Sequence, residues 1–256
     1  CLWISEKKFP RPSTIIITER EYCMNKEDLS SRLLLLQVND ALFPIGAYSH
    51  SYGLETYIQE GRVRDAKTAG EYISRKLALG TVYTDLLAVR LACEKAGTGN
   101  LEALDELEDM LEASLIPREC REAFKKLGNR FAKTVSGLPI PWKTQVFEAY
   151  VKRRGEGGVC HPCAYGVFCA GTGIPAEDAM LHYLYAQTSA MITNCVKAVP
   201  LSQTEGQKIL TAMLGDFPGL LKQAKEAPEE MLGLGAPGFD LAGIRHETLY
   251  SRLYMS

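Results

Sequence analysis

Long apolar runs and a dominant charge are both missing from this chain of 256 residues. No apolar run approaches the roughly 20 residues that a helix needs to span a bilayer. Lys and Arg total 29 against 31 Asp and Glu, giving a net charge of −2. This balance provides no general attraction to nucleic acid or to an anionic membrane. We therefore expect neither a membrane protein nor a nucleic-acid-binding protein.

Motifs for nucleotide binding and hydrolytic catalysis are missing as well. The sequence contains no Gly-x-x-x-x-Gly-Lys-Ser/Thr, no Gly-x-Ser-x-Gly and no His-Glu-x-x-His, and it has only 4 His. Residues 233–238 spell Gly-x-Gly-x-x-Gly, but no strand precedes them, so a dinucleotide site is not expected. We predict that the chain is not an enzyme and holds no tightly bound cofactor. The alternative, a helical enzyme of unknown chemistry, lacks any paired carboxylates or nucleophile–base set.

The first residues carry no secretory signal, because no apolar segment with a small-residue cleavage site follows the opening Cys1-Leu-Trp-Ile. The 8 Cys are therefore expected to be mostly free thiols in a reducing compartment, and the chain is predicted to be cytoplasmic. Met24 directly precedes a helix-like segment. We interpret residues 1–23 as a disordered extension of a domain that covers residues 24–238.

Helical periodicity dominates the sequence after residue 28. Apolar residues recur at steps of three and four at Leu101, Leu104, Leu107, Leu111 and Leu115, with acidic residues between them on a face expected to be solvated. Pro175 is suited to the start of a helix, and Pro200 ends its periodic pattern. Ser202-Gln-Thr-Glu205 is a capping box that begins the next helix. No strand pattern of any length is present, so the predicted fold is all-α, a single compact helical domain with a flexible C-terminal tail.

The tail is predicted to comprise residues 239–256. It follows a spacer, residues 233–238, whose Gly and Pro content disfavours a helix. Two Tyr, two Leu, a Met and Arg252 then follow, and aromatic and Arg side chains are frequent anchors of protein interfaces. These residues are compatible with a partner-binding tail, and composition alone does not decide between this and the alternative. The alternative is a segment that folds back on its own domain.

Cys160-His161-Pro-Cys163 is the arrangement that most resembles a metal or redox site. Two thiolates and an imidazole could ligate Zn²⁺ or Ni²⁺, with Cys169 as a further donor. The sequence lacks the second Cys-x-x-Cys that would make a zinc site a strong prediction. Free thiols without a shared ligand remain the alternative.

Residues 43–55 form the other dense segment. Pro44 and Gly46 interrupt a helix begun near Leu33, and polar and aromatic residues then crowd into one turn. Ser49 or Ser51 is expected to cap the helix that carries Glu55. The segment is either a buried turn satisfied by its own hydroxyls or a binding surface.

Taken in order, five blocks resemble the UreF family of urease accessory proteins. They are residues 35–55 (Leu-Gln, Pro-Ile-Gly, Tyr-Ser, Gly-Leu-Glu), residues 127–131 (Leu-Gly-Asn-Arg-Phe), His161 with Tyr165-Gly-Val167, residues 195–200 (Cys-Val-Lys-Ala-Val-Pro) with Gln203 and Gln207, and residues 246–254 (His-Glu-Thr-Leu-Tyr-Ser-Arg-Leu-Tyr). Residues 1–23 match nothing in the family pattern, and neither Cys160 nor Cys163 belongs to it.

The resemblance implies an all-helical, dimeric maturation factor rather than an enzyme. Family members bind a second accessory protein, UreD (UreH in some systems), and then recruit the GTPase UreG. The assembly delivers Ni²⁺ to the urease apoprotein, and nickel is thought to pass through a channel inside it. GTP would then be bound by the partner alone, and nickel would be in transit.

The resemblance also implies roles for individual residues. The predicted contacts with UreD/UreH are His246, Tyr250, Arg252, Leu253 and Tyr254, with Arg252 donating hydrogen bonds to carboxylate or carbonyl groups. The predicted channel or UreG face comprises Tyr48, Ser49, His50, Glu55, Lys197 and Gln203. The competing hypothesis is a metal-binding or redox protein that uses Cys160, His161 and Cys163.

Overall fold

The structure, a computed structural model, describes residues 26–256, with the backbone alone for residues 26–28 and 48. Its helices are α1 (Lys26–Val38), α2 (Leu54–Gln59), α3 (Ala66–Lys76), α4 (Leu87–Gly97), α5 (Leu101–Ser114), α6 (Arg118–Ser136), α7 (Val146–Arg154), α8 (His161–Thr172), α9 (Ala176–Ala198), α10 (Gln203–Leu214), α11 (Phe217–Glu226) and α12 (Pro237–His246). Shorter turns are η1 (Ala47–Ser49), η3 (Gly155–Gly157) and η4 (Glu229–Met231), and η2 (Leu77–Leu86) is a π-helix that joins α3 to α4. The predicted extension, residues 1–23, lies outside the described part.

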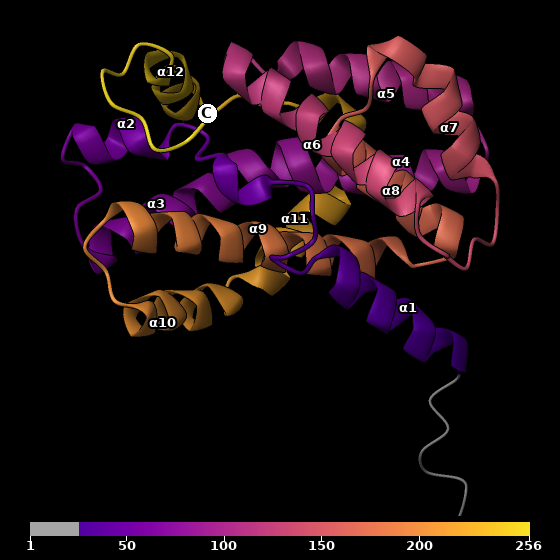
Figure 1. Ribbon diagram of the computed structural model, residues 1–256, viewed down its shortest axis with the longest axis horizontal. Helices are drawn as coiled ribbons and strands as arrows, with labels where there is room; N and C mark the ends of the chain where they lie inside the picture. The colour runs from indigo at the N-terminus through magenta and orange to yellow at the C-terminus, as the bar shows by residue number, and fades with distance from the viewer. Residues whose placement is uncertain (1–25) are drawn as a thin grey trace, which may run out of the picture.

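The all-helical prediction is confirmed, since residues 26–256 contain no strand. In Figure 1, α4, α6 and α8 lie at the centre of the bundle, α9 crosses below them, and α1 projects away from the body. Along the same described stretch, none of the helices has both the length and the apolar character that crossing a membrane would require.

Helix α8 is the buried centre of the bundle and packs most extensively against α4 and then α6. Glycines make these approaches possible. A Cβ atom on Gly166 would lie 2.6 Å from the carbonyl oxygen of Val89 in α4, and one on Gly128 of α6 would overlap the carbonyl oxygen of Val159 just before α8. Any larger residue would force the helices apart, and such overpacking typically costs about 1–3 kcal/mol.

Aromatic side chains fill the space between α6, α8 and the loop before α7. Phe131 and Phe168 meet edge to face with ring centroids 5.4 Å apart. Trp142 stacks on Phe147 at 5.0 Å and lies edge-on to Phe168. Such pairs stabilise a fold by about 0.5–1.5 kcal/mol beyond the area that they bury.

The leucine period of residues 101–115 forms α5, and Leu104, Leu107 and Leu111 are fully buried. The acidic face between them is less solvated than predicted. Arg153 of α7 pairs with Glu102 and Asp105, and Arg154 pairs with Asp105 and Asp109. These ion pairs hold α7 against α5.

Most of the predicted helix boundaries are confirmed. Ser202 and Glu205 form the capping box of α10, Pro175 is the N-cap of α9, and α9 ends two residues before Pro200. The cap expected for α2 is wrong, because its N-cap is Gly53 and no side chain caps it. Ser51 and Ser49 instead direct their hydroxyls to the carbonyls of Ser256 and Gly46.

The C-terminal residues pack onto their own domain, which is the second of the two alternatives left open by the sequence. Pro237 occupies the first turn of α12, where its missing N–H costs nothing, so the expected start of the tail at residue 239 falls inside a helix. Helix α12 lies beside α2 (Figure 1). The residues after it return to the turn that precedes α2.

Candidate functional site

The candidate site is the seat of the C-terminal segment, defined as residues 249–256, on α2, α6, α9 and the turn at residues 49–53. The backbone of that turn is unusual, with φ +51° at Tyr52 and +86° at Gly53. A Cβ atom on Gly53 would lie 2.9 Å from the amide nitrogen of Gly243, so glycine is required both by φ and by the approach of α12.

The strained turn directs two successive amides at one acceptor. The N–H groups of Ser51 and Tyr52 donate to the carbonyl oxygen of Ser256 at 2.6 and 2.9 Å, and the Ser51 hydroxyl donates to the same oxygen at 2.7 Å. Concavities of successive amides are typical sites for anionic or carbonyl oxygens. His50 Nδ1 lies 2.9 Å from the Ser256 hydroxyl, and the Met255 amide donates to Ser49.

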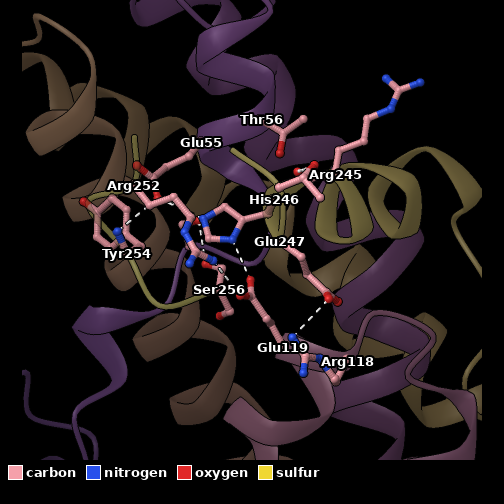
Figure 2. A network of polar contacts seen from close by, with 12 residues as sticks. Glu55, Thr56, Arg118, Glu119, Arg245, His246, Glu247, Arg252, Tyr254 and Ser256 are labelled. Carbon is pink, nitrogen blue, oxygen red and sulfur yellow. Dashed lines mark hydrogen bonds and ion pairs between the residues drawn. The ribbon is translucent and has the colours of Figure 1, made fainter. Parts of the chain in front are cut away.

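Two glutamates and a histidine form the centre of the site, called here the Glu–His–Glu cluster (Glu55, His246 and Glu119; Figure 2). His246 is fully buried. Its Nε2 lies 3.0 Å from Glu55 Oε2, and its Nδ1 lies 2.7 Å from Glu119 Oε2. The cluster therefore connects α2, α6 and the last residue of α12.

The same carboxylates hold the C-terminal segment. Glu55 accepts the amides of Leu253 at 2.7 Å and Tyr254 at 3.0 Å, while Glu119 accepts Arg252 Nη1 at 2.7 Å. Figure 2 shows the side chain of Arg252 beside His246 and Glu119. Hydrogen bonds with an ionised partner are roughly twice as strong as neutral ones, so this is a firm attachment.

The residues predicted to contact a partner fall into two groups. His246 and Tyr254 are buried, and the Tyr254 hydroxyl donates to the carbonyl oxygen of Asn194 at 3.3 Å. Tyr250 is fully exposed and Leu253 is 75 % exposed. Arg252 is between these extremes, half-exposed and paired with Glu119. The first group anchors the segment, and the second is presented to solvent.

The structure brings together only some of the residues predicted to form the channel or UreG face. Ser49, His50 and Glu55 all contact the C-terminal segment. Tyr48 belongs to η1, and its side chain is outside the described part. Lys197 near the end of α9 and Gln203 at the start of α10 are exposed at the two ends of one connection.

Glu119 and Asn194 were missed by the sequence reading. Glu119 stands in the charged first turn of α6 and looks like a solvated residue, because its partners are 127 and 133 positions away. Asn194 donates to the carbonyl oxygen of His50 at 2.8 Å, yet its own Oδ1 is buried without a hydrogen-bond partner. Nothing in the local sequence indicates either contact.

A small cavity of about 80 Å³, lined by both apolar and polar side chains, lies behind the turn. Its lining includes Tyr52, Lys76, Asp85 and Cys120. Burial raises the pKa of the Asp85 carboxyl, which accepts hydrogen bonds from Thr84 at 2.6 Å and from Tyr183 at 3.2 Å. The cavity is large enough for ordered water.

The Cys160–Cys163 segment is buried in the centre of the fold. Burial raises the pKa of both thiols, so they remain protonated and are poor metal ligands or nucleophiles. Glu108, also unpredicted, accepts the Cys160 amide at 2.9 Å and the Tyr150 hydroxyl, so this carboxyl satisfies groups at the start of α8. Among the residues described, no group of three or more His, Cys, Asp or Glu side chains is placed to hold a metal ion.

His161 contacts the aromatic core. Its Nδ1 lies 3.3 Å from the Tyr183 hydroxyl, and its ring meets Phe131 edge to face. Burial lowers the pKa of His161 to about 4, and that of His50 to about 4 as well. Both rings are therefore neutral at physiological pH.

The lowered pKa values of these two histidines predict that the free energy of unfolding decreases in mild acid. Below pH about 6.5 the unfolded chain binds a proton on each, whereas the folded chain does not until about pH 4, so stability falls as pH falls through this window. Each group contributes up to about 1.4 kcal/mol per pH unit. The free energy of unfolding of His161→Gln can be measured by urea titration at several pH values between about pH 5 and pH 6.5. Plotted against pH, it should have a slope smaller than that of the wild type by about one proton. An unchanged slope would contradict the neutral, buried state of this ring.

Comparison of the sequence with known proteins finds relatives that match over most of its length. The profile of the UreF family matches residues 63–214. A urease accessory protein UreF of Lachnoclostridium phytofermentans is 31 % identical over 226 residues, covering 88 % of this chain and 98 % of the relative. Proteins of the same name from Haemophilus influenzae (strain PittGG) and Bacillus sp. (strain TB-90) are each 34 % identical, and the matches cover 94 % and 100 % of their lengths.

Proposed function

This chain belongs to the UreF family of urease accessory proteins, and we propose that it is the scaffold on which a urease maturation complex assembles. Its relatives are named as accessory proteins, so its role lies in the maturation of urease and not in catalysis. The finer proposal is that it binds UreD/UreH, recruits the GTPase UreG and assists delivery of Ni²⁺ to the urease apoprotein. Nickel is cargo in this scheme, and GTP is bound and hydrolysed by the partner.

The observation that carries this proposal is the way in which the C-terminal segment is presented. Buried His246, Tyr254 and Ser256 alternate with residues that reach solvent. The exposed apolar side chains at this end of the molecule are Leu241, Ile244, Tyr250, Leu253 and Met255. Because Glu55 accepts the amides of Leu253 and Tyr254, the backbone that presents Leu253 is already held in place, so its display carries little entropic cost on binding. A rigid aromatic and aliphatic surface beside Arg252 has the composition of an interface centre.

We assign this surface to UreD/UreH and a second one to UreG. The second comprises the turn that carries Tyr48 and the exposed residues Lys197 and Gln203. His50 and Glu55, expected on that face, are buried and hold the C-terminal segment. Their contribution to binding is therefore through the placement of the segment.

The double variant Tyr250→Ala/Leu253→Ala tests the first assignment. Truncated anchors at the centre of an interface typically cost about 1–2 kcal/mol each, so capture of the chain by UreD/UreH should weaken about tenfold or more. Arg252→Ala should also weaken capture, since it loosens the segment. Affinity can be measured by pull-down and calorimetry with purified UreD/UreH.

Leu181→Ala/Tyr185→Ala is the matched control, because it removes a half-exposed Leu and Tyr from α9. The control should bind as the wild type does. Equal affinity of wild type and Tyr250→Ala/Leu253→Ala would refute the assignment. Point variants are preferable to deletion of residues 239–256, which would cut α12 in its first turns.

We also propose that the chain forms a homodimer through α1. Leu29, Leu33 and Leu36 are 40 %, 56 % and 60 % exposed and follow one another at steps of four and three residues, whereas Leu34, Leu35 and Val38 face the core. A helix that projects from the body with such a stripe matches its own copy across a two-fold axis.

Leu33→Arg/Leu36→Arg is expected to convert the dimer to a monomer, because two charges would face the same charges of the second copy. Light scattering with size-exclusion chromatography should give a mass of twice the 28.3 kDa chain for the wild type and the single-chain mass for the variant. Leu214→Arg, at an exposed leucine of α10, should leave the mass unchanged. A variant that stays dimeric would place the interface elsewhere.

A further inference from the structure

A pocket of about 320 Å³, called here the arginine pocket, lies between α2, α3 and the start of α12. These three helices lie at the same side of the molecule in Figure 1. Three aromatic rings form part of its wall, with centroids 5.2 Å apart for Tyr57 and Tyr72, 5.8 Å for Tyr57 and Phe239, and 5.7 Å for Tyr72 and Phe239. The buried Val63 and the half-exposed Leu79 add further apolar surface. The wall can therefore receive an apolar side chain.

Two arginines, Arg62 and Arg75, also line this pocket, and each has donors to spare. Arg62 lies over the Tyr57 ring, 4.9 Å from its centroid. It reaches Glu60 at 3.4 Å, but Arg245 binds the same carboxylate more closely, at 2.9 Å. Arg75 is exposed and has no hydrogen bond or ion pair with any residue that the structure describes. A guanidinium carries five N–H donors, so both groups can bind an acceptor from outside the chain.

The hydroxyl of Tyr57 is a third donor at the same place. Within the described part of the chain it has no hydrogen-bond partner, and it lies beside Gly238 of α12, where a Cβ atom would be 3.4 Å from it. Burial raises the pKa of this hydroxyl, and Glu60 adds to the rise. Arg62 and Arg75 both act against it, so the charges of the two guanidiniums reach the same hydroxyl.

We infer that the arginine pocket binds a carboxylate side chain, with an apolar side chain next to it, on the surface of UreD/UreH. This assignment rests on the proposed function and adds the chemistry by which the partner is recognised. Arginine binds carboxylates through charge-assisted and often bidentate hydrogen bonds. The aromatic wall beside the two guanidiniums accommodates the apolar neighbour.

The charges around the pocket favour an acidic occupant. The whole chain has a net charge of −2, so the positive charge here is local. Arg62 and Arg75 line the pocket together with one carboxylate, that of Glu71. Glu71 forms no ion pair within the described residues, although it lies one helical turn from Arg75. Lys76 adds a third positive charge, with its Nζ 4.8 Å from the centroid of the Phe239 ring.

The position of the pocket identifies the partner. Phe239 in its wall is followed along α12 by Leu241 and Ile244, which are 53 % and 43 % exposed and belong to the surface assigned above to UreD/UreH. A protein that covers these side chains also reaches the arginine pocket, where Pro237 of the same helix is exposed. Charged contacts beside an apolar interface fix the orientation of a partner and speed its association.

The double variant Arg62→Glu/Arg75→Glu tests this assignment by calorimetry with purified UreD/UreH. Binding should weaken about tenfold or more at low ionic strength, and the difference from the wild type should shrink at about 0.5 M salt, where exposed charges are screened. Arg64→Glu/Lys67→Glu is the matched control, because it changes the net charge equally at exposed positions that do not line the pocket. The control should bind as the wild type does. All four side chains are exposed, so circular dichroism should show the wild-type helix content in both variants.

Cross-linking identifies the occupant directly. A carbodiimide joins an amine to a carboxylate that is in contact with it. In the complex formed by Arg75→Lys, mass spectrometry should find position 75 joined to an Asp or Glu of UreD/UreH. Arg64→Lys should give no such product.

Equal affinity of the wild type and Arg62→Glu/Arg75→Glu would overturn the inference and leave the scaffold proposal standing. An equal loss in the Arg64→Glu/Lys67→Glu control would also overturn it, since net charge alone would then explain the effect. A cross-link from position 75 to a second copy of this chain would contradict the assigned occupant. Failure of UreD/UreH to bind even the wild type would overturn the scaffold proposal and this inference together.

Discussion

Two carboxylates, the buried Glu55 and the partly buried Glu119, hold the end of the chain to the helical domain. Both lie within hydrogen-bond distance of the His246 ring, and in addition Glu55 accepts two backbone amides and Glu119 accepts Arg252. A buried charge that loses its partner typically costs about 3–5 kcal/mol, which makes this set cooperative. The close approach of α12 to α2 at Gly53 and the display of Tyr250 and Leu253 both depend on it.

Interactions between residues close in sequence could be predicted, whereas those between residues far apart in sequence could not. The leucine period of α5 and the capping box at Ser202 are local patterns, and both were predicted. The family blocks marked Glu55 and His246 without showing that they touch, because 191 positions separate them. The local sequence does not distinguish Glu108 from the other acidic residues of α5, although its side chain is fully buried. Such residues become recognisable only when the partner helix is in place.

The absence of catalytic motifs and the presence of an ordered, exposed C-terminal surface lead to the same view of the molecule. Its titratable core groups, Glu108, Asp85 and His161, satisfy other buried groups and hold the bundle together. Exposed apolar residues line α12, the C-terminal segment and α1, and others, such as Leu42, Leu79 and Leu214, are distributed over the rest of the described surface. Such a construction suits the accessory role of the family, and under the scaffold proposal the partners would supply the chemistry of maturation.

Reconstitution of urease activation from purified components tests that view most directly. Apo-urease, UreD/UreH, UreG, GTP and Ni²⁺ are mixed with this chain, with its Tyr250→Ala/Leu253→Ala variant or with neither, and nickel bound to urease is measured together with ureolytic activity. Nickel loading that requires the wild-type chain and fails with the variant is the predicted result. Loading that proceeds equally well without the chain would contradict its role as the scaffold of maturation.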